Sequence, residues 1–190
     1  MKNQIEIAVR IWHGSIPKPF AQGVESCYFP DFHNGINNKD VGGLFGGHVA
    51  MQLGEFVYGF YFKDLKKLHL FPSKTTNCEF QKNSIIEWED RVKDRKETQF
   101  FIPVSAEQYQ YLLDFFERNI QKPEVDYAVF GERCTSQTFR LLNEAGLIKN
   151  DHRIWHAYYP GRLSAYLHRI CRSNNWKIAT KPGCHQRIWN

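Results

Sequence analysis

The chain has 190 residues, of which 42% are hydrophobic and 15% aromatic, and this is enough material for one packed core. Such a composition excludes an intrinsically disordered chain, and two independent domains of half this length would each be small. The longest apolar runs, such as residues 56–62, fall far short of the roughly 20 residues of a membrane-spanning helix. We therefore expect a single domain with no transmembrane segment, made in the cytoplasm without a signal peptide.

Charge is distributed unevenly along the chain. Lys and Arg number 25 against 20 Asp and Glu, which gives a net charge of +5. Residues 151–190 hold seven basic residues and one acid, whereas residues 1–150 are close to neutral. A basic segment on a near-neutral body indicates an anionic partner, which could be nucleic acid, acidic lipid, the bacterial wall or an acidic protein. Solubility alone is the simpler explanation.

The cysteines and histidines do not form a metal-binding pattern. There are five cysteines, and no two of them are separated by only two residues. This argues against a zinc ribbon and against a complete disulfide framework, although a bond between Cys171 and Cys184 stays open. His152 and His156 have helical spacing but lack the accompanying carboxylate of a zinc hydrolase. We expect neither a metal nor a cofactor.

The first half of the chain has β character. Alternating apolar side chains predict a strand over residues 5–9. Residues 14–46 are rich in Gly, Pro, Asn and aromatic side chains, which is typical of a long functional loop. A β-hairpin follows, with strands at 48–53 and 56–62 joined by a tight Gly-Glu turn. His48 would then lie near the open end of the hairpin.

Further strands are followed by helices. The additional strands are predicted at 67–71, 84–88 and 98–104. Ser105 and Gln108 have the spacing of a capping box at the start of an amphipathic helix. A second helix begins close to Cys134 and ends before Gly146, and a third covers residues 163–171. The sequence therefore predicts an α+β fold, with helices packed on an antiparallel sheet.

Cys134 stands where a nucleophilic cysteine is expected, in the first turn of a helix. The unpaired N–H groups and the dipole of a helix N-terminus stabilise a thiolate and can also receive an oxyanion. His48 is the best candidate for its base, because the glycines around it leave room for a substrate backbone. The alternative is that Cys134 is a buried core residue and His48 a surface residue at a strand end.

Four motifs follow one another along the chain, so that a histidine strand precedes the cysteine helix: "GGHVAMQLG", "VYGFYF", "SAEQYQYLL" and "DYAVFGERCTSQTFRLLNEAGL". Their order resembles that of the circularly permuted papain-like cysteine hydrolases, a branch that includes relatives of NlpC-type cell-wall peptidases and of lecithin-retinol acyltransferase. This resemblance covers roughly residues 42–147. It implies a permuted papain-like domain over residues 1–150, with 151–190 as a basic helical extension packed on the same domain.

By this resemblance Cys134 is the nucleophile and His48 the base and later the acid. The resemblance also implies a polar group on the next strand that orients the imidazole. The usual His, Asn or Gln is absent there, and Glu55, Tyr58 and Tyr61 are the available candidates, of which we choose Tyr58. The absence of the usual His, Asn or Gln leaves open a catalytic dyad or an inactive relative.

Other residues are weaker candidates. Gly47 and Trp12 could line a substrate groove, and Arg133 could tune the nucleophile that follows it. Acyltransferase-like relatives have Asn at the position of Arg133, so this residue departs from their pattern. Cys78 follows Asn77 and so has the Asn-Cys pair of the acyltransferase-like relatives, which Cys134 lacks. No amphipathic helix follows Cys78, however. We therefore prefer Cys134.

The expected function is hydrolysis of an amide bond through an acyl-enzyme on Cys134. The resemblance implies a peptide of peptidoglycan as substrate, and a basic tail suits an anionic wall. Such an enzyme could be an antibacterial effector, exported to a target-cell periplasm by a machine such as the type VI system, with an immunity protein as partner. The alternatives are an acyltransferase or thioesterase of the same fold, and a non-catalytic binding module that uses the basic aromatic tail. Nucleic acid is the less favoured partner, because no nucleic-acid motif is recognised.

Overall fold

The computed structural model describes residues 5–13, 15–17, 47–64, 69, 71–73, 77–128, 131–149, 160–183 and 187–189. Within these residues the fold is α+β, as predicted, with a six-stranded sheet and four helices. The strands of this sheet are β1 (Ile5–His13), β3 (Gly47–Leu53), β4 (Phe56–Phe62), β5 (Cys78–Ser84), β6 (Glu97–Val104) and β7 (Ile178–Lys181). Two short strands, β2 (Ser15–Pro17) and β8 (Arg187–Trp189), pair in parallel in a separate sheet.

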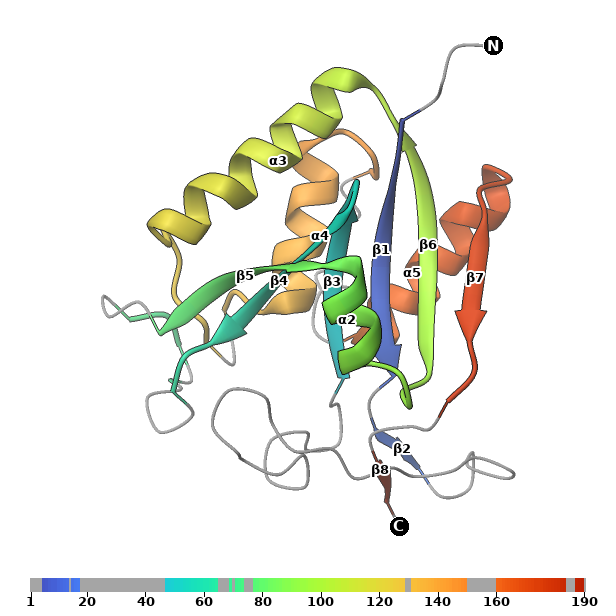
Figure 1. Ribbon diagram of the computed structural model, residues 1–190, viewed down its shortest axis with the longest axis horizontal. Coiled ribbons are helices and arrows are strands. Elements are labelled where there is room, and N and C mark those ends of the chain that lie inside the picture. The colour runs from blue at the N-terminus through green and yellow to red at the C-terminus, as the bar shows by residue number, and fades with distance from the viewer. Residues whose placement is uncertain are drawn as a thin grey trace.

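All neighbouring strands of the large sheet are antiparallel, in the order β5-β4-β3-β1-β6-β7. The first strand of the chain therefore lies in the interior of the sheet, between β3 and β6 (Figure 1). The predicted hairpin is confirmed, because β3 and β4 pair directly across the turn at Gly54. Gly54 has a φ of +58°, a left-handed conformation that a glycine adopts without strain.

The helices divide between the two faces of the sheet. They are α2 (Ile85–Arg91), α3 (Ala106–Gln121), α4 (Cys134–Glu144) and α5 (Pro160–Ser173). Figure 1 shows α2 in front of the sheet and α4 and α5 behind it. Packing of α4 against β3 and of α5 against β6 and β1 fixes the two rear helices on the sheet.

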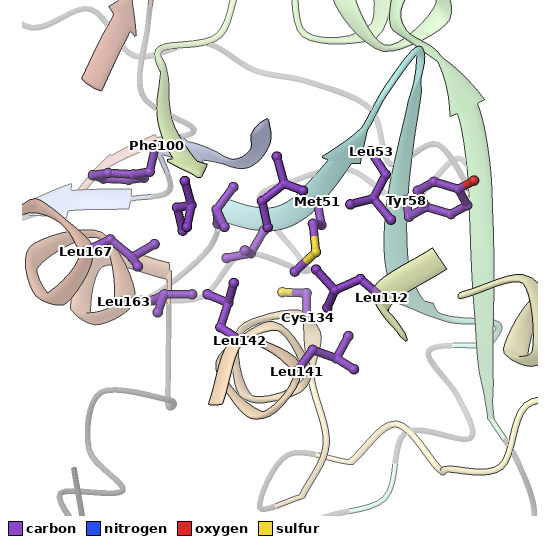
Figure 2. Close-up of a cluster of buried hydrophobic side chains, with 14 of the residues drawn as sticks. Met51, Leu53, Tyr58, Phe100, Leu112, Cys134, Leu141, Leu142, Leu163 and Leu167 are labelled. Atoms are coloured by element: carbon purple, nitrogen blue, oxygen red, sulfur yellow. The ribbon is translucent and has the colours of Figure 1, made fainter. Parts of the chain in front are cut away.

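Each face has its own buried cluster, because successive side chains of a strand point to opposite sides. On the side of α3, α4 and α5, the large core includes Met51, Phe100, Leu112, Leu142 and Leu167 (Figure 2). On the side of α2, a smaller cluster consists of Trp12, Ala50, Val57, Trp88 and Val92. The side that a β3 residue faces therefore determines which cluster it joins.

The structure corrects one predicted strand. Residues 84–88 were expected to be extended because Ile85, Ile86 and Trp88 favour strands, but they begin helix α2. The Ser84 side chain accepts a hydrogen bond from the Glu87 N–H, and the Glu87 carboxylate accepts one from the Ser84 N–H. This capping box nucleates the helix and outweighs the strand propensity of the residues inside it.

The remaining elements follow the sequence in most places. Strand β6 and helices α3, α4 and α5 appear where the patterns predicted them, and the first strand extends further than expected, to His13. Strand β7 is an edge strand of the large sheet, and α5 contributes Leu163 and Leu167 to the large core. The predicted loop at 14–46 lies outside the described residues except for β2, as do His152, His156, Cys184 and most of the strand predicted at 67–71.

Candidate functional site

Helix α4 begins at Cys134. Arg133, the residue before the helix, is extended, with φ −140° and ψ 172°. The first helical hydrogen bond runs from the Gln137 N–H to the Arg133 carbonyl at 2.8 Å, so the N–H groups of the first turn have no acceptor within the helix. Ser136 satisfies the Arg133 N–H at 2.7 Å with its hydroxyl oxygen. The predicted helix N-terminus at Cys134 is therefore present.

The Cys134 thiol is buried on the side of the large core. Its residue is 6% exposed, and Figure 2 shows the sulfur among Met51, Leu112 and Leu142. The Thr135 hydroxyl lies 3.8 Å from the sulfur. Cys134 is therefore packed as a core residue, as the alternative interpretation expected.

Tyr127 is a second polar group near this thiol, after Thr135, and the phenol and the thiol affect each other electrostatically. Burial of the phenol raises the pKa of Tyr127 well above its ordinary value, the charge of a Cys134 thiolate would raise it further, and the Arg133 guanidinium opposes the shift. The Tyr127 phenol and the Cys134 thiol are therefore near each other at the start of α4.

Backbone contacts hold Tyr127 in this position. Tyr127 and Glu132 form a β-bridge, and the Ala128 N–H donates to the Glu132 carbonyl at 3.1 Å. At Gly131 a Cβ atom would lie 2.7 Å from Pro72 Cγ, so this position favours a glycine. The Tyr127 ring packs against Phe60 and Phe62, with ring centroids 5.1 and 5.7 Å away.

His48 is buried on the other side of the sheet, with an exposed fraction of 6%. The alternative that His48 is a surface residue is therefore wrong. Its ring centroid lies 4.3 Å from that of Tyr61, in a stacked arrangement, and 4.9 Å from that of Trp12. Trp88 of helix α2 lies farther away, at 6.3 Å.

The imidazole of His48 and the thiol of Cys134 thus pack on different faces of the sheet. His48 shares its face with Trp12 and Ala50, and Cys134 belongs to the core around Met51. Tyr61 is near both residues. Its ring stacks on that of His48, and a charge on Cys134 would raise the pKa of the Tyr61 phenol. Burial is the larger cause of that raised pKa.

The structure does not place Tyr58 beside His48. Tyr58 points to the opposite side of β4, where its ring stacks on Phe116 at 4.8 Å and its hydroxyl donates to Glu117 at 2.9 Å. Burial, followed by the Glu117 carboxylate, raises the pKa of Tyr58. Figure 2 shows its hydroxyl pointing away from Cys134. The choice of Tyr58 fails because residues adjacent in the strand alternate between faces.

The residue that takes the expected place is Tyr61. In a hairpin closed at Gly54 and Glu55, the pairing that joins Ala50 to Gly59 brings the next residues of the same face, His48 and Tyr61, opposite each other. The length of the turn could have identified Tyr61 from the sequence. Tyr127 has no comparable signal in the sequence, because its position depends on packing against the distant residues Phe60 and Phe62.

The other predicted site residues lie in two different places. Trp12 and Gly47 do lie at the His48 end of the sheet, since Trp12 pairs with His48 and Gly47 with His13. Gly47 has a φ of +107°, which a side chain would strain. Arg133 instead lies beside Tyr127 and Cys134.

Cys78 lacks the surroundings of a nucleophile. It lies in strand β5, its thiol donates to the Val125 carbonyl at 2.6 Å, and burial raises its pKa to about 11. Burial likewise raises the pKa of Cys171, a free thiol, to about 11. Neither cysteine stands at the start of a helix.

A buried ion network connects α2 to the sheet next to His48. The Arg10 guanidinium donates to both oxygens of Glu97, at 3.0 and 2.8 Å, and also pairs with Glu89 of α2. The Trp88 indole N–H donates to Glu97 at 2.8 Å. The network therefore fixes Trp88 above the ring system that surrounds His48.

Comparisons with known proteins leave the family open. No family model and no curated protein matches the chain. One solved structure similar to it is the crystal structure of a type VI secretion system effector, TseH, with 10% sequence identity and a TM-score of 0.48. The likeness covers 95% of this chain and 100% of that chain. At this identity and TM-score we take neither fold nor activity from TseH, and we derive the proposed function from the residues of this chain.

Two further site types find no support within the described ranges. No group of three or more His, Cys, Asp or Glu side chains there could hold a metal ion. No described helix is both long and apolar enough to cross a membrane.

Proposed function

We propose that this chain is a cysteine hydrolase that cleaves an amide bond through an acyl-enzyme on Cys134, with His48 as the base. The observation that carries the proposal is the start of α4, where Cys134 lies in the first turn and the N–H groups of that turn have no acceptor within the helix. A tetrahedral adduct on the sulfur would present its oxyanion to these N–H groups. Cys78 and Cys171 have no such arrangement.

The reaction has two halves. His48 takes the thiol proton, and the sulfur attacks the carbonyl carbon to form a tetrahedral oxyanion, which the Cys134 N–H stabilises. Collapse breaks the carbon–nitrogen bond, and the imidazolium returns the proton to the leaving amine. Water, deprotonated by His48, then attacks the thioester and releases the carboxylic acid and the free thiol.

Because the His48 imidazole and the Cys134 thiol pack on different faces of the sheet, the proposal requires the start of α4 and the end of β3 to rearrange when substrate binds. Catalytic hydrogen bonds are often long or misaligned without substrate and shorten in the complex. We therefore expect the His48 imidazole and the Cys134 thiol to come within hydrogen-bonding distance only in the substrate complex.

The finer proposal is a permuted papain-like enzyme that acts on the peptide of peptidoglycan. In its support, the histidine strand β3 precedes the cysteine helix α4, and the two pack against each other. The proposed biological role is that of an antibacterial effector which is exported to a target cell and inhibited by an immunity protein. Positive charge on α5 suits an anionic wall.

The test measures amine groups released from purified peptidoglycan. Cys134→Ala and His48→Ala should each lower the rate by on the order of 10³-fold or more while the circular dichroism spectrum is unchanged. Cys171→Ala, which removes a buried thiol of the same kind, is the matched control and should keep full activity. Full activity in both site variants would refute the proposal, and a fatty-acyl mass shift on Cys134 with a lipid donor would favour acyl transfer.

A second candidate function is binding without catalysis, through helix α5. Arg162, Arg169 and Arg172 are exposed on one side of α5, and residues 160–183 contain no acid. The Arg169 guanidinium lies over the Tyr166 ring, 5.4 Å from its centroid. The experiment is heparin binding as a function of salt. Charge reversal of these three arginines should abolish binding, while reversal of the exposed Lys93 and Arg118 should not.

A further inference from the structure

The imidazole of His48 is enclosed by aromatic rings on both neighbouring strands. Strand β3 lies between β1 and β4, and each supplies one ring to His48. Trp12 of β1 lies 4.9 Å from the His48 ring at an interplanar angle of 44°, and Tyr61 of β4 lies at 4.3 Å and 15°. All three residues are 6–7% exposed. The imidazole is therefore held from two sides in the interior.

The Tyr61 ring is fixed in this position by its packing on β4. A Cβ atom on Gly59 would lie 2.5 Å from Tyr61 Cε2, so the ring lies flat over the one residue type that leaves space for it. Burial raises the pKa of the Tyr61 phenol, and the nearby positive charge of Arg91 of helix α2 opposes that rise. The ring is therefore held by its packing.

Trp12 is fixed as well. Its ring stacks on Trp88, with centroids 5.5 Å apart and an interplanar angle of 13°. The Arg95 guanidinium also lies over the Trp12 ring, 4.3 Å from its centroid. Because the Trp88 indole N–H donates to Glu97, the Trp12 ring is connected through Trp88 to the ion network under α2.

A stacked ring constrains an imidazole differently from a hydrogen-bonding side chain. The ring nitrogens of histidine donate and accept in the plane of the ring, whereas a nearly parallel neighbour covers its face. Tyr61 therefore cannot be the in-plane partner of His48 in this arrangement. What it does restrict is the rotation of the imidazole about χ1 and χ2.

We propose that Trp12 and Tyr61 are positioning residues that hold the His48 imidazole by stacking, in the place where papain-like relatives use a polar third residue. This inference rests on the proposed hydrolase for its catalytic meaning. It explains how the chain lacks His, Asn or Gln on the strand after His48 and still has an ordered imidazole. It also predicts that the Tyr61 ring matters and its hydroxyl does not.

The first readout is independent of activity. In the full chain, the His48 carbon-bound ring protons are followed by NMR and assigned with His48→Gln. Tyr61→Phe should leave their ring-current shift unchanged, and Tyr61→Leu should move it toward the position of an unshielded histidine. Tyr58→Leu, on the same strand but the opposite face, is the matched control and should not move it.

The second readout is the rate at which iodoacetamide alkylates Cys134 at each pH, read by mass spectrometry. Tyr61→Phe should reproduce the wild-type profile, whereas Tyr61→Leu should lower the rate below pH 7 by roughly tenfold, as expected for a displaced base. Trp12→Phe and Trp12→Leu form a second pair with the same expectation, which covers the case in which Tyr61→Leu does not fold. Cys78 and Cys171 serve as slow-reacting internal references.

The outcomes separate the two proposals. If Tyr61→Leu leaves the His48 protons in place, or if Tyr61→Phe moves them as far, stacking does not hold the imidazole and this inference is overturned. If the protons move as expected but wild-type Cys134 has the pH profile of an ordinary thiol, the stacking stands and the proposed hydrolase fails. Loss of alkylation in Tyr61→Leu but not in Tyr61→Phe supports both.

Discussion

The two faces of the sheet are built from different chemistry. Under α2, a charged network of Arg10, Glu89 and Glu97 is buried together with the rings around His48. Behind the sheet, helices α3, α4 and α5 cover an almost entirely apolar core that includes Met51. Apolar packing tolerates many arrangements of similar volume, whereas buried charges need particular partners. The α2 face is therefore the one whose geometry is most narrowly specified.

The largest effect is expected from breaking the ion network on the α2 face. Arg10→Met leaves the buried Glu97 carboxylate without its guanidinium and should lower the free energy of unfolding by about 3–5 kcal/mol. Urea denaturation gives this value. Lys82→Met is the control, because the Lys82–Glu117 pair is exposed and should cost less than about 1 kcal/mol. Equal effects of the two substitutions would remove the distinction between the faces.

A cavity in the apolar core should cost nearly as much. Leu142→Ala removes a fully buried side chain of α4 and should destabilise the protein by about 2–5 kcal/mol, depending on how far the core collapses. Ile86 of α2 is 82% exposed, and Ile86→Ala should change stability by less than about 0.5 kcal/mol. A loss at Leu142 as small as that at Ile86 would show that this core is not tightly packed.

The smallest expected effect is a loss of stability at alkaline pH, caused by two buried thiols of the large core. Burial raises the pKa of the Cys78 and Cys171 thiols to about 11, above their ordinary value near 8.5. Between these values the unfolded chain loses the thiol protons first, so stability should fall as pH rises from about 9 to 11. The double variant Cys78→Ala and Cys171→Ala should show a shallower fall in urea midpoint over that range than wild type. An identical slope would contradict the assignment.

Local patterns predicted much of this fold. The alternation in β1 and the hairpin, the capping box before α3 and the glycine after α4 each act within a few residues, so the sequence reveals them directly. The misassigned helix α2 was also locally encoded, since Ser84 and Glu87 form its cap. There the capping box outweighs the strand propensity of the two isoleucines that follow it.

The site depended on information that a single sequence carries less openly. Cys134 at a helix start was predictable, but its position in the apolar core follows from how α4 rotates on the sheet, which the whole core determines. Tyr61 could have been found from the hairpin register. The partners of Arg10 could not, because Glu89 and Glu97 come from elements more than 70 residues away in the chain.

The central place of β1 has a consequence for how the chain acquires its structure. Its two neighbours, β3 and β6, end at residues 53 and 104, so one long edge of β1 stays unpaired until more than half of the chain has been synthesised. Pairings this distant in sequence slow folding, and an open, apolar strand edge is a site of association with other chains. Molecular chaperones that shield nascent strands should therefore raise the yield of this protein, and a circular permutant that begins at β6 should depend on them less.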